Sequence, residues 1–71
     1  MIYAVEKEKL YHKDIGEYTT FGLRAYCKGK CVAFISDVSV DERFVTELAE
    51  RFTAAQLSVI HLKEVIDDIL P

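Results

Sequence analysis

The residues Thr19-Thr20-Phe21-Gly22-Leu23-Arg24-Ala25-Tyr26-Cys27 decide the fold of this chain. Apolar side chains recur at every second position, and β-branched and aromatic types are frequent, which is typical of a half-buried β-strand. Cys31 to Ser36 is a second run of this kind, and Lys28-Gly29-Lys30 forms a short polar connection between the two. Because glycine accepts positive φ, the two runs are predicted to form a β-hairpin.

A further strand is expected before this hairpin, from Ile2 to Tyr11. Residues 12–16 then turn the chain, which gives a three-stranded meander. Within the first strand, Glu6 and Glu8 are in phase with the apolar residues Ile2, Ala4 and Leu10. We expect a β-bulge, or an early end to burial, to remove this conflict.

Near Asp37 the hydrophobic period changes from that of a strand to that of a helix. Ser39 and Glu42 have the spacing of a capping box, so a helix is predicted to begin at Ser39. A turn at residues 54–57 is followed by Ser58, which is predicted to cap a second helix. The apolar stripes of the two helices are Val40, Phe44, Val45, Leu48, Ala49 and Phe52, and Val59, Leu62, Val65, Ile66, Ile69 and Leu70.

Strands followed by helices predict an α+β fold, because the helices must bury their apolar stripes against the sheet. The expected architecture is a three-stranded antiparallel β-meander followed by a two-helix hairpin packed on one face of the sheet. With 71 residues, 51% of them hydrophobic, and one proline, the chain is expected to be a single small domain over residues 1–71.

Charge and hydropathy exclude two classes of partner. The net charge is -3, and the second expected helix sets Lys63 against Glu64, Asp67 and Asp68, so we expect no nucleic acid to bind. The apolar start at Met1 to Val5 is interrupted by the charged residues 6–9, which excludes a signal peptide and a membrane span at this position. We therefore expect a cytoplasmic protein with no membrane partner.

Three groups of residues resemble those of a known family. They are Glu17-Tyr18-Thr19-Thr20-Phe21-Gly22, then Ile35-Ser36-Asp37-Val38-Ser39, then Leu57-Ser58 with His61-Leu62, Val65-Ile66 and Asp68 to Leu70. In this order they resemble a family of short uncharacterised bacterial proteins from Gram-positive anaerobes, classed as a domain of unknown function. The resemblance covers the chain from Glu17 onward and implies a cytoplasmic bacterial protein. It supplies no activity, cofactor or site residue.

The sequence shows no catalytic constellation, so we expect a protein that is not an enzyme and has no cofactor. No serine or cysteine stands in a nucleophile-and-base arrangement, and no glycine-rich loop is suited to phosphate. Cys27 and Cys31 flank the expected hairpin turn, and two thiolates so placed could bind a metal or small ligand, with His12 and His61 as further zinc ligands. A small binding protein is therefore the alternative function. Such cysteines are more often reduced thiols that pack as small apolar side chains than metal ligands.

The face of the sheet turned away from the helices is the candidate interaction site. If Cys27 lies opposite Cys31, then Tyr26, Val32 and Phe34 point away from the helices, while Phe21, Leu23, Ala25, Ala33 and Ile35 lie beneath them. A two-residue turn would flip the third strand and uncover Cys31, Ala33 and Ile35 instead. Either register leaves an apolar face of the sheet uncovered. Because the core of so small a domain supplies little stability, burying this face against a partner would stabilise the fold. The sequence therefore predicts a non-enzymatic protein-interaction module that forms a homodimer through Tyr26, Val32 and Phe34, with room for a further protein partner.

Overall fold

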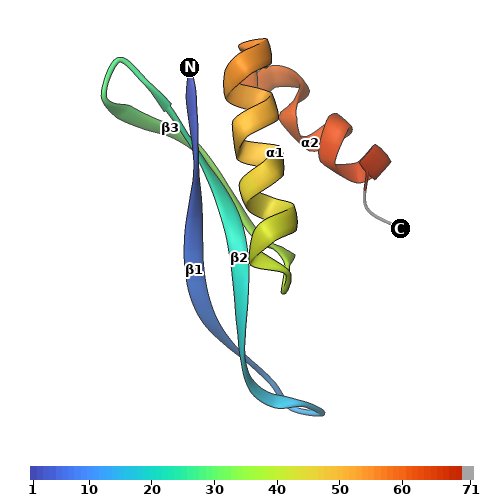
Figure 1. The fold of residues 1–71 in the computed structure, drawn as a ribbon. Helices are drawn as coiled ribbons and strands as arrows, with labels where there is room; N and C mark the ends of the chain where they lie inside the picture. The colour runs from blue at the N-terminus through green and yellow to red at the C-terminus, as the bar shows by residue number, and fades with distance from the viewer. Residues whose placement is uncertain (70–71) are drawn as a thin grey trace.

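The computed structural model describes residues 1–69 as three strands followed by two helices. The strands are β1 (Ile2–His12), β2 (Gly16–Cys27) and β3 (Lys30–Ser39), and the helices are α1 (Glu42–Ala55) and α2 (Val59–Ile69). The strands form one antiparallel sheet in the order β1-β2-β3. Both helices lie on the same side of this sheet (Figure 1). The α+β fold predicted from the sequence is confirmed.

The core lies between the sheet and the helices. Alternate residues of β2 supply its floor, and Leu23 and Ala25 are fully buried there. The helices supply Val45, Leu48, Ala49, Phe52, Leu62 and Ile66, and Ala33 and Ile35 pack against the edge of the same cluster. This confirms which face of the sheet the helices cover. Two predicted stripe residues are not in the core, because Val40 is 67% exposed and Ile69 is 40% exposed, and Leu70 lies outside the described residues.

The predicted N-cap of the first helix, Ser39, is wrong by two residues. Ser39 still belongs to β3, where it pairs with Phe21, and α1 begins at Glu42 with Asp41 as its N-cap. The Asp41 carboxylate accepts hydrogen bonds from the backbone N–H groups of Arg43 and Phe44, at 3.0 and 3.4 Å. Ser39 Oγ instead accepts from the backbone N–H of Asp41, at 3.1 Å. The carboxylate of Asp41 therefore takes the N-cap role that the spacing of Ser39 and Glu42 had suggested for Ser39.

We expect Asp41→Ala to lower the free energy of unfolding by about 1 kcal/mol, because it leaves two backbone donors at the start of α1 without their acceptor. Ser39→Ala is the matched control, and it should cost less because the Ser39 hydroxyl satisfies only one donor outside the helix. Urea denaturation of both variants measures the difference. A larger loss for Ser39→Ala would instead show that Ser39 is the N-cap, as the capping-box spacing predicted.

The turn between the helices fixes α1 to the start of β1. Gln56 has a positive φ of 51°, and the N–H of Leu57 donates to the Phe52 carbonyl, which closes α1 in a Schellman motif. The backbone N–H of Tyr3 donates to Thr53 Oγ1 at 2.9 Å, and the Tyr3 hydroxyl donates to the Leu57 carbonyl at 2.6 Å. These contacts hold the helix against one side of the sheet.

The predicted cap of the second helix is confirmed. Ser58 directly precedes α2, and its Oγ accepts a hydrogen bond from the backbone N–H of Ile60 at 3.3 Å. Leu62 and Ile66 then project from α2 into the core. Neither helix within residues 1–69 has the length and apolar character that crossing a bilayer requires.

The β2–β3 hairpin combines the two registers that the sequence left open. Cys27 pairs with Lys30 across a two-residue turn, in which Lys28 and Gly29 both have positive φ, as a type I′ turn requires. The register then shifts between Tyr26 and Ala25, so that Ala25 pairs with Ala33 and Leu23 with Ile35. A bulge at the tip thus cancels the flip that the short turn would cause, and the body of the strand keeps Ala33 and Ile35 beneath the helices.

Candidate functional site

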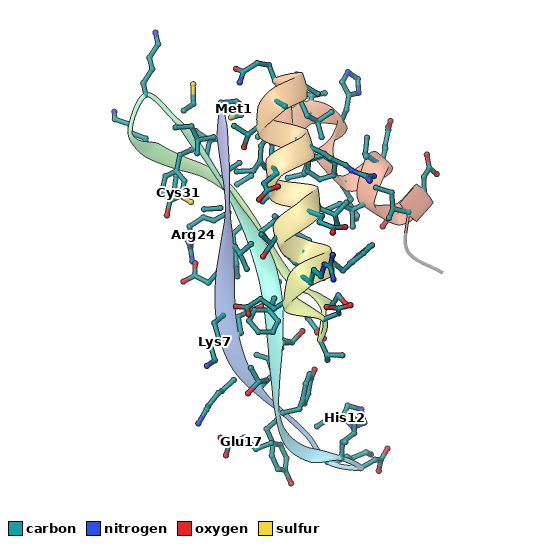
Figure 2. The ribbon with its side chains drawn as sticks, viewed as in Figure 1. Met1, Lys7, His12, Glu17, Arg24 and Cys31 are labelled. Carbon is teal, nitrogen blue, oxygen red and sulfur yellow. The ribbon has the colours of Figure 1, made fainter. Side chains whose placement is uncertain are left out.

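The open face of the sheet, meaning the face turned away from α1 and α2, is the candidate site. Side chains alternate along each strand, so residues next to the buried ones in β1, β2 and β3 point to this face. Figure 2 shows Arg24 and Cys31 on the side of the sheet opposite the helices. Arg24 Nη1 lies 3.4 Å from Cys31 Sγ, which places both groups on the same face.

One end of this face is apolar. The open-face patch consists of Ile2, Tyr26, Val32 and Phe34, and Ile2 pairs with Tyr26 across β1 and β2. Ile2 is 61% exposed, Val32 48% and Phe34 38%. The structure therefore brings together the three residues predicted as an interface. Ile2 was missed because its neighbour across the sheet depends on the β1–β2 register, which the sequence left undetermined.

An ion pair borders the patch. The Arg24 guanidinium donates to the carboxylate of Glu6 and lies over the Phe34 ring, 4.5 Å from its centroid. The hydrogen bond to Glu6 raises the pKa of Arg24 above its ordinary value, and the contact with Cys31 adds to this effect. Arg24 therefore stays charged while its guanidinium covers one side of the aromatic ring.

A second polar cluster joins all three strands further along the face. The Glu8 carboxylate accepts from the Ser36 hydroxyl at 2.8 Å and from the backbone N–H of Asp37 at 2.9 Å. Asp37 in turn accepts from the Tyr18 hydroxyl at 3.0 Å and from the Thr20 hydroxyl at 2.6 Å. The hydrogen bond to Asp37 raises the pKa of Tyr18, because the phenolic proton is held by a carboxylate.

These contacts resolve the conflict seen in the sequence of the first strand. β1 pairs with β2 from Ile2 to His12 without a register shift, so the bulge, one of the two expected outcomes, is not formed. Burial instead ends early, since no residue of β1 after Tyr3 is buried. Glu6 and Glu8 lie on the open face and are satisfied there by Arg24 and by the β3 residues Ser36 and Asp37. The charges are compatible with the strand because this face has no helix over it.

The two cysteines do not form a common site. Cys31 pairs with Tyr26, and Cys27, which follows Tyr26 in β2, pairs with Lys30. Because neighbouring residues of a strand point to opposite faces, the two thiols lie on opposite faces of the sheet. Both are free thiols. His12 lies at the end of β1 and His61 on α2. Within residues 1–69 no group of three or more His, Cys, Asp or Glu side chains is arranged to hold a metal ion.

The fold and the open face define a small α+β domain whose sheet has one uncovered side. The chain belongs to the Family of unknown function (DUF6514), whose model matches residues 1–71. The match includes the strand before Glu17, which the resemblance seen in the sequence did not cover. No curated protein and no solved structure is significantly similar to the chain.

Proposed function

We propose that this protein is a non-enzymatic, cytoplasmic interaction module that forms a homodimer by packing the open faces of two sheets together. The observation that supports the proposal most strongly is the open-face patch, where Ile2 of β1 and Val32 and Phe34 of β3 remain exposed and Tyr26 of β2 is half-buried. Exposed apolar groups that adjoin one another mark interaction surfaces in small proteins more often than isolated ones do. A two-fold dimer is the commonest way to bury such a surface.

The charges beside the patch support a second copy as the occupant. Arg24 and Glu6 stand next to each other at its border, one of each sign. In a two-fold pair the border of one copy meets the border of the other, so each Arg24 is presented with a partner Glu6 and no like charges need to face each other. The surface is therefore self-complementary in charge as well as apolar at its centre.

The polar cluster around Asp37 supports a structural role for its carboxylates. Glu8 and Asp37 accept hydrogen bonds from four donors that belong to β2 and β3. Thr20, whose hydroxyl also lies 3.0 Å from the Ser39 carbonyl, is fully buried. These groups hold the irregular end of β3 against β2, and we propose no catalytic role for them.

We expect Phe34→Glu to convert the dimer into a monomer. The substitution places a second carboxylate beside Arg24, which already pairs with Glu6, so the seam gains a net negative charge, and burying an uncompensated charge costs several kcal/mol. It also removes the ring over which Arg24 lies. Light scattering over a concentration series gives the molar mass of the wild-type and variant proteins.

Tyr11→Glu provides the matched control, because Tyr11 is an aromatic residue of the same sheet that is 76% exposed and lies outside the open-face patch. We expect this variant to remain a dimer. A wild-type protein that stays monomeric at high concentration contradicts the proposed function. A dimer that survives Phe34→Glu places the contact elsewhere on the surface.

A further inference from the structure

The outer edge of β1 offers backbone groups to a further strand. β1 is at the edge of the sheet, because β2 pairs with it on one side only. The N–H of Tyr3 points away from β2 and donates to Thr53 of α1. In an antiparallel pair, inward and outward backbone positions alternate, so Val5 and Lys7 also present their N–H and C=O groups to this free edge.

A groove runs between this edge and α1. It has a volume of about 510 Å³. One wall is Ile2 to Val5, and the other consists of Thr46, Ala49, Glu50, Thr53 and Ala54. Small side chains at four of these five helix positions keep α1 from filling the space. The groove therefore combines an open strand edge with an apolar wall beside it.

We propose that this groove binds an extended peptide segment of another protein, which adds to the sheet as an antiparallel strand beside β1. The outward backbone groups select an extended chain, because only a strand can satisfy successive N–H and C=O groups along an edge. This proposal goes beyond the homodimer, since it uses the edge of the sheet and shares only Ile2 with the open-face patch.

Two charged residues indicate the sequence that the peptide should carry. Glu50 lines the groove, and Lys7 is the next outward position of β1 beyond Val5. Within residues 1–69 neither side chain forms an ion pair. A strand antiparallel to β1 passes Lys7 first and Glu50 afterwards. The matching segment therefore has an acidic residue, then a small apolar residue opposite Val5, then a basic residue.

A second copy of β1 does not meet these requirements. Antiparallel pairing of two β1 edges centred on Lys7 would place the two lysines directly opposite each other, which is destabilising. Pairing centred on Val5 would place Tyr3 opposite Lys7, where the proposed peptide carries an acidic residue. Lysines on an edge strand are a common device against such self-pairing.

The test uses two capped peptides, Thr-Asp-Thr-Val-Thr-Lys-Thr and its charge-exchanged form Thr-Lys-Thr-Val-Thr-Asp-Thr. Fluorescence anisotropy gives the affinity of each peptide for the full chain, and amide hydrogen exchange reports the Val5 and Lys7 N–H groups. We expect the first peptide to bind about fivefold more tightly, because two exposed ion pairs are gained. We also expect it to slow exchange at both amides.

Two variants at exposed positions of α1 test whether the peptide binds in the groove. Ala54→Trp places a large ring in the groove and should abolish binding, whereas Ala55→Trp, at an adjacent exposed residue that does not line the groove, should leave it unchanged. Circular dichroism checks that both variants are folded. Equal affinity for the two peptides, or no protection of Val5 and Lys7, would overturn the proposal. A change in molar mass with Ala54→Trp alone would assign the groove to a second copy instead and would equally overturn it.

Discussion

Replacing Gly22 with alanine should lower the free energy of unfolding by about 3 kcal/mol, near the upper end of what overpacking costs. A Cβ atom at this position would lie 2.5 Å from the Ile35 carbonyl oxygen, which is closer than real Cβ contacts come. The obstacle is backbone, so it cannot rotate away. The same atom would lie 3.1 Å from a Glu8 carboxylate oxygen and from the Phe34 ring.

Thermal unfolding measures this loss, and in so small a domain it corresponds to a fall in Tm of about 12–24 °C. Gly29→Asn is the matched control. Gly29 has a positive φ, which asparagine tolerates, and nothing lies within 4 Å of a Cβ built there. We expect the control to lose less than about 1 kcal/mol. If Gly22→Ala is as stable as Gly29→Asn, the close approach of β3 to Gly22 is incorrect.

Leu23→Ala should be comparably damaging, with a loss of about 2–5 kcal/mol. Leu23 is fully buried on the central strand, where the sheet meets the helices. Truncation leaves a cavity that the rigid strand cannot close. Because the core of a domain this small supplies only about 3–5 kcal/mol in total, we expect much of the variant to be unfolded at 25 °C. Urea denaturation followed by circular dichroism measures the loss.

Val40→Ala is the control for this prediction. The sequence placed Val40 in the apolar stripe of the first helix, but the residue precedes α1 and is largely exposed. We expect its truncation to change the stability by less than about 0.5 kcal/mol. A loss of 2 kcal/mol or more would return Val40 to the core and would contradict the position found for the start of α1.

The fold class could be predicted because local patterns express it directly. Period-two alternation in β2 placed Leu23 and Ala25 beneath the helices, and the serine at position 58 marked the start of α2. A lone glycine inside a strand is typical of a bulge or of a close approach between backbones, and both occur at Gly22. The β2–β3 register shifts between Phe21 and Leu23, the two neighbours of Gly22, and a Cβ atom at Gly22 would lie 2.5 Å from the Ile35 carbonyl oxygen.

The remaining features could not be read from the sequence because each depends on contacts between distant segments. Glu8 appeared to conflict with burial in β1, yet its partners Ser36 and Asp37 reach it across β2 only after the sheet has formed. Asp37 takes a positive φ of 53° at this point, and Ser39, two residues later, still pairs with Phe21 in β3. The N-cap is consequently Asp41, whose carboxylate supplies the capping group, and α1 begins at Glu42.

The candidate site was likewise predictable from the sequence only in part. Tyr26, Val32 and Phe34 were predicted to share a face, and they do, because the bulge at the tip of the β2–β3 hairpin restores their register. The contribution of Ile2 and the Arg24 contacts with Glu6 and Phe34 required the β1–β2 register. The groove beside α1 required the position of the helix over β1, which no pattern within either segment encodes.

The dimer through the open face is tested most directly by isotope-filtered NMR on an equimolar mixture of labelled and unlabelled chains. This experiment detects only proton contacts between two copies. We expect intermolecular contacts from the Phe34 ring to the Val32 methyl groups and to Ile2 of the other copy. Intermolecular contacts confined to other exposed apolar residues, such as Ile60 of α2, or none at a concentration where light scattering shows a dimer, would contradict the account.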